Sequence, residues 1–186
     1  CGDCVESTYH DDKMTLVLAD GLGSGVKANI LSTLTAKIIC TMMAEGLNME
    51  ECVSTIASTL PVCAERQIAY STFTILQVGR DGNAYLAQFD NPETIFIRDG
   101  KVTPYEKTEK NLHGKLIYES RFTLQEDDMF LAMSDGVIHA GVGMLLNFGW
   151  QMEDVVNYVQ ENYRRDMSAK MMANTLVGAC RDLYMD

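Results

Sequence analysis

The chain has 186 residues, 47% of them hydrophobic, and its 15 basic and 26 acidic side chains give a formal net charge of −11 at pH 7. This length predicts a single domain over residues 1–186 with a substantial core. The acidic excess argues against nucleic acid as a partner, because that contact needs clustered lysine and arginine. No apolar run approaches the roughly 18 residues that cross a membrane. We therefore expect a cytoplasmic domain without membrane contact of its own, although its parent protein could be membrane-attached.

The first three predicted elements surround a glycine-rich turn. Residues 1–9 are predicted to form a strand that contains Gly2-Asp3, and a polar turn over residues 10–13 leads to the next strand. That second strand is apolar from Leu16 to Ala19 and ends in Asp20. Glycines at positions 21, 23 and 25 then allow a tight turn beside this carboxylate. Asp20 either caps the following helix or binds a hard cation.

A nucleotide-phosphate loop is the main alternative for glycines between a strand and a helix. The dinucleotide fingerprint needs G-x-G-x-x-G, and here the third glycine is misplaced. The P-loop needs Gly-Lys-Ser/Thr, whereas Lys27 is followed by Ala28. Asp20 would also repel a bound pyrophosphate. The loop therefore favours a metal site, and a dinucleotide-binding domain stays a minor alternative that predicts protection by NAD against melting.

The helix predicted over residues 24–44 has apolar residues at Val26, Ile30, Leu34 and Ile38 and ends at Gly46. A polar stretch from Glu106 to Lys115 shows no clear periodicity. Asn48 and Ser168 are candidate caps of later helices. The further helices are predicted over residues 49–63, 152–163 and 169–184, and the further strands over residues 69–78, 84–89, 94–98, 102–105, 121–124 and 129–133.

Cys1 and Cys4 form the C-x-x-C motif of a chain with six cysteines. A zinc site would need a second pair, or histidines at matching spacing, and the sequence has neither. Reduced thiols that pack as small hydrophobic residues are therefore favoured over a zinc or redox centre.

Asp135 repeats the arrangement at Asp20, because the apolar run Phe130–Met133 leads into Ser134-Asp135-Gly136. If the two strands are neighbours, both carboxylates meet at one edge of a sheet. Two carboxylates close together repel, so a bound cation would be their natural companion. Two unrelated turns are the alternative.

These residues, in this order, give the chain a resemblance to the PPM (PP2C-like) metal-dependent protein serine/threonine phosphatases, above all to the bacterial SpoIIE/RsbU branch. Each motif is weak by itself, but the ordered set covers essentially the whole chain. The matching segments are Gly2-Asp3, Ala19–Gly25, Tyr70–Thr74, the Asp90-Asn91-Pro92 turn with Asp99-Gly100, and Met133–Val137.

The resemblance implies an α+β fold, a four-layer α-β-β-α sandwich of two stacked, mainly antiparallel sheets flanked by helices. It also implies two Mn²⁺ or Mg²⁺ ions. Carried over to this chain, Asp20 would bridge both ions, the carbonyl oxygen of Gly21 would bind one, and Asp135 would bind one directly. Asp3 would contribute through water or from a second shell of ligands. Asp20 and Asp135 are thus the expected catalytic residues.

The implied reaction is hydrolysis of a phosphoserine or phosphothreonine on a regulatory protein by a metal-activated water. In this branch the substrate is typically a STAS-type anti-sigma-factor antagonist. A dimer is kept among the expected assemblies.

One departure from the family bears on activity. The family carries another metal-binding aspartate in an Asp-Asp/Asn-x-Thr motif on a final strand, and this chain ends at Asp186 without it. We therefore expect a domain that lacks its last strand, possibly excised from a longer protein since it begins at Cys1, and whose truncated form could be inactive. The alternative function is a non-catalytic regulatory or partner-binding module that keeps the fold.

Overall fold

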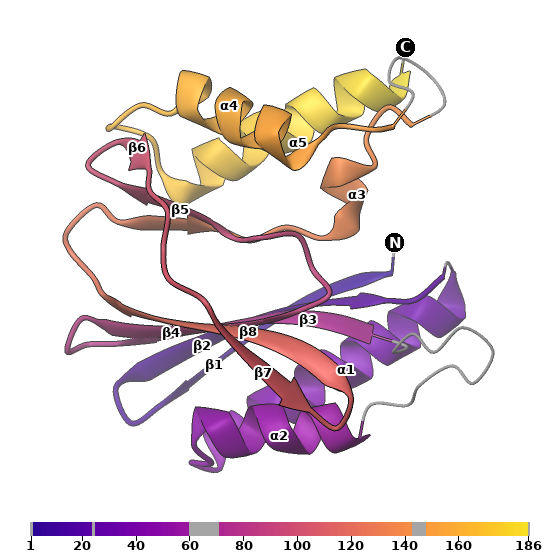
Figure 1. Cartoon of the computed structure of the whole chain (residues 1–186), viewed down its shortest axis with the longest axis vertical. Coiled ribbons are helices and arrows are strands. Elements are labelled where there is room, and N and C mark those ends of the chain that lie inside the picture. Colours follow the sequence, from indigo (N-terminus) through magenta and orange to yellow (C-terminus); the bar gives the residue numbers. More distant parts are fainter. Residues whose placement is uncertain (1, 24, 60–70, 143–147, 186) are drawn as a thin grey trace. The chain divides into compact units, whose positions relative to one another are not determined.

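The computed structural model describes residues 2–23, 25–59, 71–142 and 148–185, and the chain divides into two compact units (Figure 1). Unit 1 comprises residues 1–91 and 106–124, and unit 2 comprises residues 92–105 and 125–186. None of the helices in the described ranges is long and apolar enough to cross a membrane.

Unit 1 is a six-stranded antiparallel sheet in the order β1-β2-β3-β4-β8-β7, with α1 and α2 on one face (Figure 1). Strand residues that alternate toward the helices form its core, including Val17, Phe73, Ile75 and Ile117. The elements are β1 (Asp3–His10), β2 (Lys13–Gly21), α1 (Val26–Ala44), α2 (Met49–Thr59), β3 (Ser71–Gly79), β4 (Asn83–Phe89), β7 (Thr108–Leu112) and β8 (Lys115–Thr123).

Over its described residues, unit 2 is a three-stranded antiparallel sheet in the order β6-β5-β9 with the helices α3, α4 and α5. Its core combines the sheet residues Ile95, Ile97 and Leu131 with residues of α4 and α5. The elements are β5 (Ile95–Arg98), β6 (Lys101–Val102), β9 (Met129–Leu131), α3 (Asp135–Ile138), α4 (Met152–Asn162) and α5 (Ala169–Met185).

The predicted α+β class with antiparallel sheets and flanking helices is confirmed. Both side-chain caps are confirmed as well, since Asn48 Oδ1 accepts a hydrogen bond from the Glu51 amide at 2.9 Å and Ser168 Oγ accepts one from the Met171 amide at 3.2 Å. Parts of the predicted helix 49–63 and strand 69–78 lie outside the described residues.

The stretch from Glu106 to Lys115, for which the sequence shows no period, contains strand β7, and β8 begins at Lys115 rather than near Arg121. The segment Thr108–Leu112 reads TEKNL, and its side chains are mostly exposed or half-buried. Because β7 is an edge strand that pairs with β8 alone, it needs no apolar face to stay in the sheet.

Several large aliphatic side chains of helix α1 point outward. Val26, Ile30, Leu34 and Ile38 are exposed, while Ala28, Ser32, Thr35 and Ala36 are buried toward the sheet together with Ile39, Cys40 and Met43. Small residues let the helix backbone come close to the strands, and this contact decides which side of α1 is covered. The four-residue apolar spacing identifies the helix correctly but not its buried face.

We expect Ile39→Ala to destabilise the protein by about 2–5 kcal/mol, because Ile39 is fully buried and its truncation leaves a cavity. Leu34→Ala, five residues earlier on the outer side of the helix, should change the free energy of unfolding by less than about 0.5 kcal/mol, since Leu34 is 54% exposed. Urea unfolding of both variants measures the difference. Equal losses would mean that α1 is rotated from the orientation described.

In unit 2 a partly buried ion pair between Arg98 and Asp128 closes the turn before β9. The Asp128 side chain is 2% exposed, and its carboxylate accepts hydrogen bonds from Arg98 Nε at 3.0 Å and Nη2 at 2.6 Å, and from the Gln125 amide at 2.8 Å. The hydrogen bond from Arg98 holds the pKa of Asp128 below its usual value. The charged form of Asp128 is therefore part of the folded state.

Asp128→Asn should lower the free energy of unfolding at pH 7 by about 2 kcal/mol, the contribution typical of hydrogen bonds to a charged group. A lowered carboxyl pKa stabilises the fold above the unfolded value near 3.9, and this contribution disappears as the pH falls through the folded value. The gap between wild type and variant should therefore shrink below about pH 4. Asp127→Asn, at the adjacent exposed carboxylate, is the control, and a gap that persists at low pH would contradict the assignment.

Candidate functional site

Asp3 and Asp20 face each other at the open end of the β1–β2 hairpin. The register pairs His10 with Lys13 across the turn at Asp11-Asp12 and continues to Asp3 opposite Asp20. Residues directly opposite on antiparallel strands project to the same face with Cβ atoms about 5 Å apart, so the two carboxylates are neighbours. Because β2 residues alternate and Val17 and Ala19 pack toward the helices, Asp20 lies on the other face of the sheet.

The sequence of the hairpin indicates the pairing of Asp3 with Asp20. A two-residue turn at Asp11-Asp12 fixes the hairpin so that the numbers of each pair add to 23. Asp3 must then lie opposite Asp20. The strand register therefore explains why Asp3 lies beside Asp20.

Thr72 and Asn91 extend the site across the next strand. Thr72 lies opposite Asp20 in the register of β2 and β3, and its hydroxyl is 3.5 Å from the Asp20 carbonyl oxygen. The same hydroxyl donates to Asn91 Oδ1 at 2.5 Å, and Asn91 Nδ2 donates to Thr74 Oγ1 at 3.0 Å. These contacts join the end of β4 to the strand beside Asp20. The sequence places Asn91 only in a turn, because its partner is 19 residues away.

Position 21 requires a glycine because the backbone of helix α1 lies against it. Its amide donates to the Gly2 carbonyl oxygen at 3.1 Å, which prolongs the hairpin beyond Asp3 and Asp20. A Cβ atom on Gly21 would lie 2.0 Å from the Ala28 carbonyl oxygen. Gly23 and Gly25, at φ of 94° and 77°, then turn the chain from β2 toward α1.

In unit 2, Asp135 is the first residue of the single-turn helix α3 and follows β9 closely, as the sequence predicts. Its carboxylate is 59% exposed, and its Oδ2 is 3.8 Å from Nε2 of His139, one turn further along. His139 has no assigned role in the sequence, although an i, i+4 spacing from Asp135 is the signal that could have identified this contact.

The residues predicted to hold metal are divided between the units, with Asp3, Asp20 and Gly21 in unit 1 and Asp135 in unit 2. Within the described ranges, no group of three or more histidine, cysteine, aspartate and glutamate side chains is placed to hold a metal ion. The Asp3–Asp20 pair offers the hard oxygen donors that Mn²⁺ and Mg²⁺ prefer, so its chemistry fits such an ion. The meeting of Asp20 with Asp135 stays a prediction.

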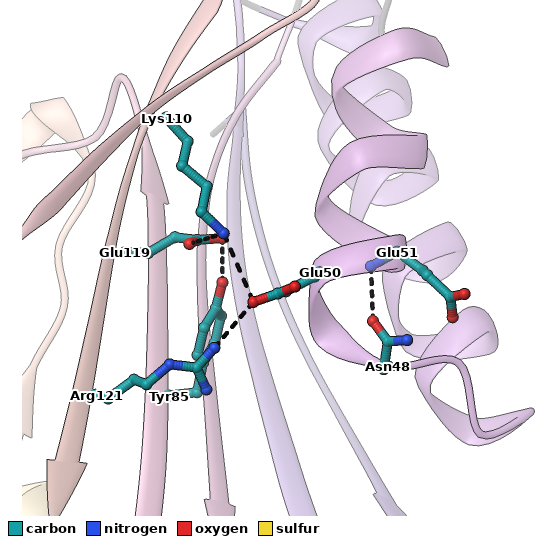
Figure 2. A network of polar contacts seen from close by, with 7 residues as sticks. All are labelled: Asn48, Glu50, Glu51, Tyr85, Lys110, Glu119 and Arg121. Carbon is teal, nitrogen blue, oxygen red and sulfur yellow. Dashed lines mark hydrogen bonds and ion pairs between the residues drawn. The ribbon is translucent and has the colours of Figure 1, made fainter.

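A concave region of unit 1 lies on the helix side of the sheet, away from Asp20. It is a cavity of about 450 Å³ whose lining includes Lys13, Tyr85 and Arg121. Figure 2 shows a charged network beside it, in which Glu50 of α2 contacts Arg121 at 3.0 Å and Lys110 at 3.6 Å.

The same network reaches the sheet interior through Glu119. Lys110 Nζ lies 2.5 Å from this buried carboxylate, the Tyr85 hydroxyl donates to it, and Arg121 stacks over the Tyr85 ring (Figure 2). The contacts attach the first turn of α2 to β4, β7 and β8. We therefore interpret this charged network as a structural contact that holds α2 on the sheet, not as a catalytic site.

Comparison with known proteins matches residues 10–185 to the family model described as Stage II sporulation protein E (SpoIIE). No curated protein sequence gives a significant match. Among solved structures, the PP2C phosphatase domain with a fragment of the regulatory domain of SpoIIE from Bacillus subtilis superposes with a TM-score of 0.77 at 18% identity, over 98% of this chain and 52% of that one.

Two further structures share the fold. The RsbU and RsbW domains of a Mycobacterium tuberculosis protein give a TM-score of 0.70 at 15% identity, over 99% of this chain and 50% of that one. RsbX in complex with magnesium gives a TM-score of 0.65 at 17% identity, over 99% of this chain and 82% of that one. The chain thus spans about half the length of the first two structures.

Proposed function

Because the chain belongs to the SpoIIE family of PP2C-like phosphatase domains, we propose that it hydrolyses a phosphoserine or phosphothreonine on a regulatory protein with the help of two divalent metal ions. The observation that carries this proposal is the pair of facing carboxylates, Asp3 and Asp20, at the open end of the β1–β2 hairpin. Like charges directly opposite on neighbouring strands are unfavourable, and a bound cation would offset that repulsion.

Asp20, the carbonyl oxygen of Gly21 and Asp135 would hold Mn²⁺ or Mg²⁺, with Asp3 beside them. When bound, such ions supply a water of lowered pKa and neutralise charge that develops on the phosphoryl group. Asp20 and Asp135 thereby act as catalytic residues through the ions they hold. Thr72 and Asn91 fix the strands around Asp20, and Gly21 lets α1 approach that strand end.

For the substrate, we propose a phosphorylated STAS-type anti-sigma-factor antagonist in the cytoplasm. The proposal rests on the family branch, and it agrees with a neighbour in which RsbU and RsbW domains occur in one protein. A net charge of −11 would make the approach of the substrate's phosphate group sensitive to salt, because that group is itself negatively charged.

The test is hydrolysis of p-nitrophenyl phosphate and of a phosphorylated STAS protein, each titrated with Mn²⁺ and reversed with EDTA. We expect hydrolysis that appears with the metal and is strongly reduced by Asp135→Asn. Metal-independent hydrolysis, or hydrolysis indifferent to that substitution, would reject the proposal.

A non-catalytic module is the second candidate. The observation behind it is that unit 1 brings two carboxylates, Asp3 and Asp20, to the open end of the β1–β2 hairpin, whereas Asp135 belongs to unit 2. A chain that binds a phosphorylated STAS protein equally well with Mn²⁺ or EDTA, without releasing phosphate, would establish this alternative.

A further inference from the structure

The turn that carries Asp135 is attached to the last helix of unit 2. The hydroxyl of Tyr184, in the last turn of α5, donates to the carbonyl oxygen of Gly136 at 2.9 Å. Gly136 follows Asp135 directly in the single-turn helix α3. The contact joins two segments that are 48 residues apart.

Packing of α5 explains why Tyr184 reaches this turn. Met172, Leu176 and Cys180 recur every four residues and are buried in the core of unit 2. Tyr184 occupies the next position of the same stripe, where the helix leaves the core, so its ring is 49% exposed. A side chain on a buried stripe is thus presented to the backbone beside Asp135.

Hydrogen bonds within the segment keep the shape of the turn. The Val137 amide donates to the Ser134 carbonyl oxygen at 3.2 Å, the His139 amide to that of Asp135 at 3.0 Å, and the Ala140 amide to that of Val137 at 3.2 Å. Tyr184 adds an anchor from α5 at the Gly136 carbonyl oxygen, one residue past Asp135. Because the turn is held together by its own hydrogen bonds, this anchor helps to place the turn, and with it Asp135, as a whole.

We propose that Tyr184 is a positioning residue, which holds the α3 turn so that the Asp135 carboxylate is oriented for a divalent cation. The inference rests on the proposed function, since it assigns Asp135 to the metal, and it adds a residue outside the matched aspartate motifs. Groups that orient a metal ligand typically change metal affinity by ten- to a hundredfold when removed. Water can replace the exposed hydroxyl in part, so we expect an effect of about five- to tenfold.

The experiment compares wild type, Tyr184→Phe, Tyr158→Phe and Asp135→Asn. Tyr158 belongs to α4 in the same unit and its ring packs against Trp150, so Tyr158→Phe removes a hydroxyl from a different helix of the unit. Mn²⁺ affinity is measured by isothermal titration calorimetry, and hydrogen exchange of residues 134–142 is measured without metal. Tyr184→Phe should weaken Mn²⁺ binding about five- to tenfold and speed exchange in the turn, whereas Tyr158→Phe should do neither.

The outcomes separate this inference from the function on which it rests. If Asp135→Asn weakens Mn²⁺ binding but Tyr184→Phe matches wild type in affinity and exchange, Tyr184 is not a positioning residue and the metal site stands. If Asp135→Asn leaves Mn²⁺ binding unchanged, Asp135 is not a metal ligand, and the proposed role of Tyr184 is rejected as well. A loss of thermal stability equal in both tyrosine variants, without a difference in affinity, would also overturn it.

Discussion

Asp20→Asn is expected to reduce Mn²⁺-dependent hydrolysis of p-nitrophenyl phosphate by about a thousandfold, because loss of a bridging metal ligand removes several kcal/mol of transition-state stabilisation. Asparagine keeps the size of the side chain and leaves the backbone pairs of Asp20 with Asp3 and Thr72 intact. The fold should therefore survive, and the loss should be one of chemistry. Activity as a function of Mn²⁺ concentration is the measurement.

A second readout keeps this prediction independent of turnover. Wild-type protein should show a higher melting temperature with Mn²⁺, because a ligand that binds only the folded state stabilises it, and Asp20→Asn should lose that increase. Asp11→Asn is the matched control, since Asp11 lies at the other end of the same hairpin in an exposed turn. Retention of both the activity and the metal-induced shift in Asp20→Asn would remove Asp20 from the site.

Gly21→Ala should destabilise the protein by more than about 3 kcal/mol, because the new methyl group would meet backbone rather than a movable side chain. The Ala28 carbonyl oxygen and carbon would lie 2.0 Å and 2.6 Å from the added Cβ. Since α1 cannot yield locally, the whole first turn of the helix must move away from β2. Denaturant unfolding measures the loss, and failure to fold would be its extreme form.

The control for Gly21→Ala is the same substitution at a glycine that has space. A Cβ on Gly178, within α5, would meet nothing within 4 Å, and its backbone is helical. Alanine there should stabilise the protein by about 0.5–1 kcal/mol, through helix propensity and a less flexible unfolded chain. The two substitutions should thus change the free energy of unfolding in opposite directions. A Gly21→Ala variant as stable as wild type would show that α1 does not pack on β2 as described.

Much of the candidate site was predictable because its determinants are local. Asp20 and Asp135 follow apolar runs and precede glycine, and these patterns place each aspartate at the end of a strand. The turn at Asp11-Asp12 fixes the register that brings Asp3 opposite Asp20. By contrast, Thr72–Asn91 and Tyr184–Gly136 join residues far apart in the chain, and no periodic pattern indicates such partners.

The sequence by itself determined the α+β class, the caps at Asn48 and Ser168 and the order of the motifs, because these depend on residues a few positions apart. Tertiary structure alone decided that TEKNL is an edge strand and that α1 buries Ala28 and Ala36 while exposing Val26, Ile30, Leu34 and Ile38. The physical reason is close packing of backbone against backbone. Gly21 leaves room for the carbonyl group of Ala28, so the small residues of α1 bring this helix closest to the sheet at that point. This backbone contact outweighs the burial of Val26, Ile30, Leu34 and Ile38.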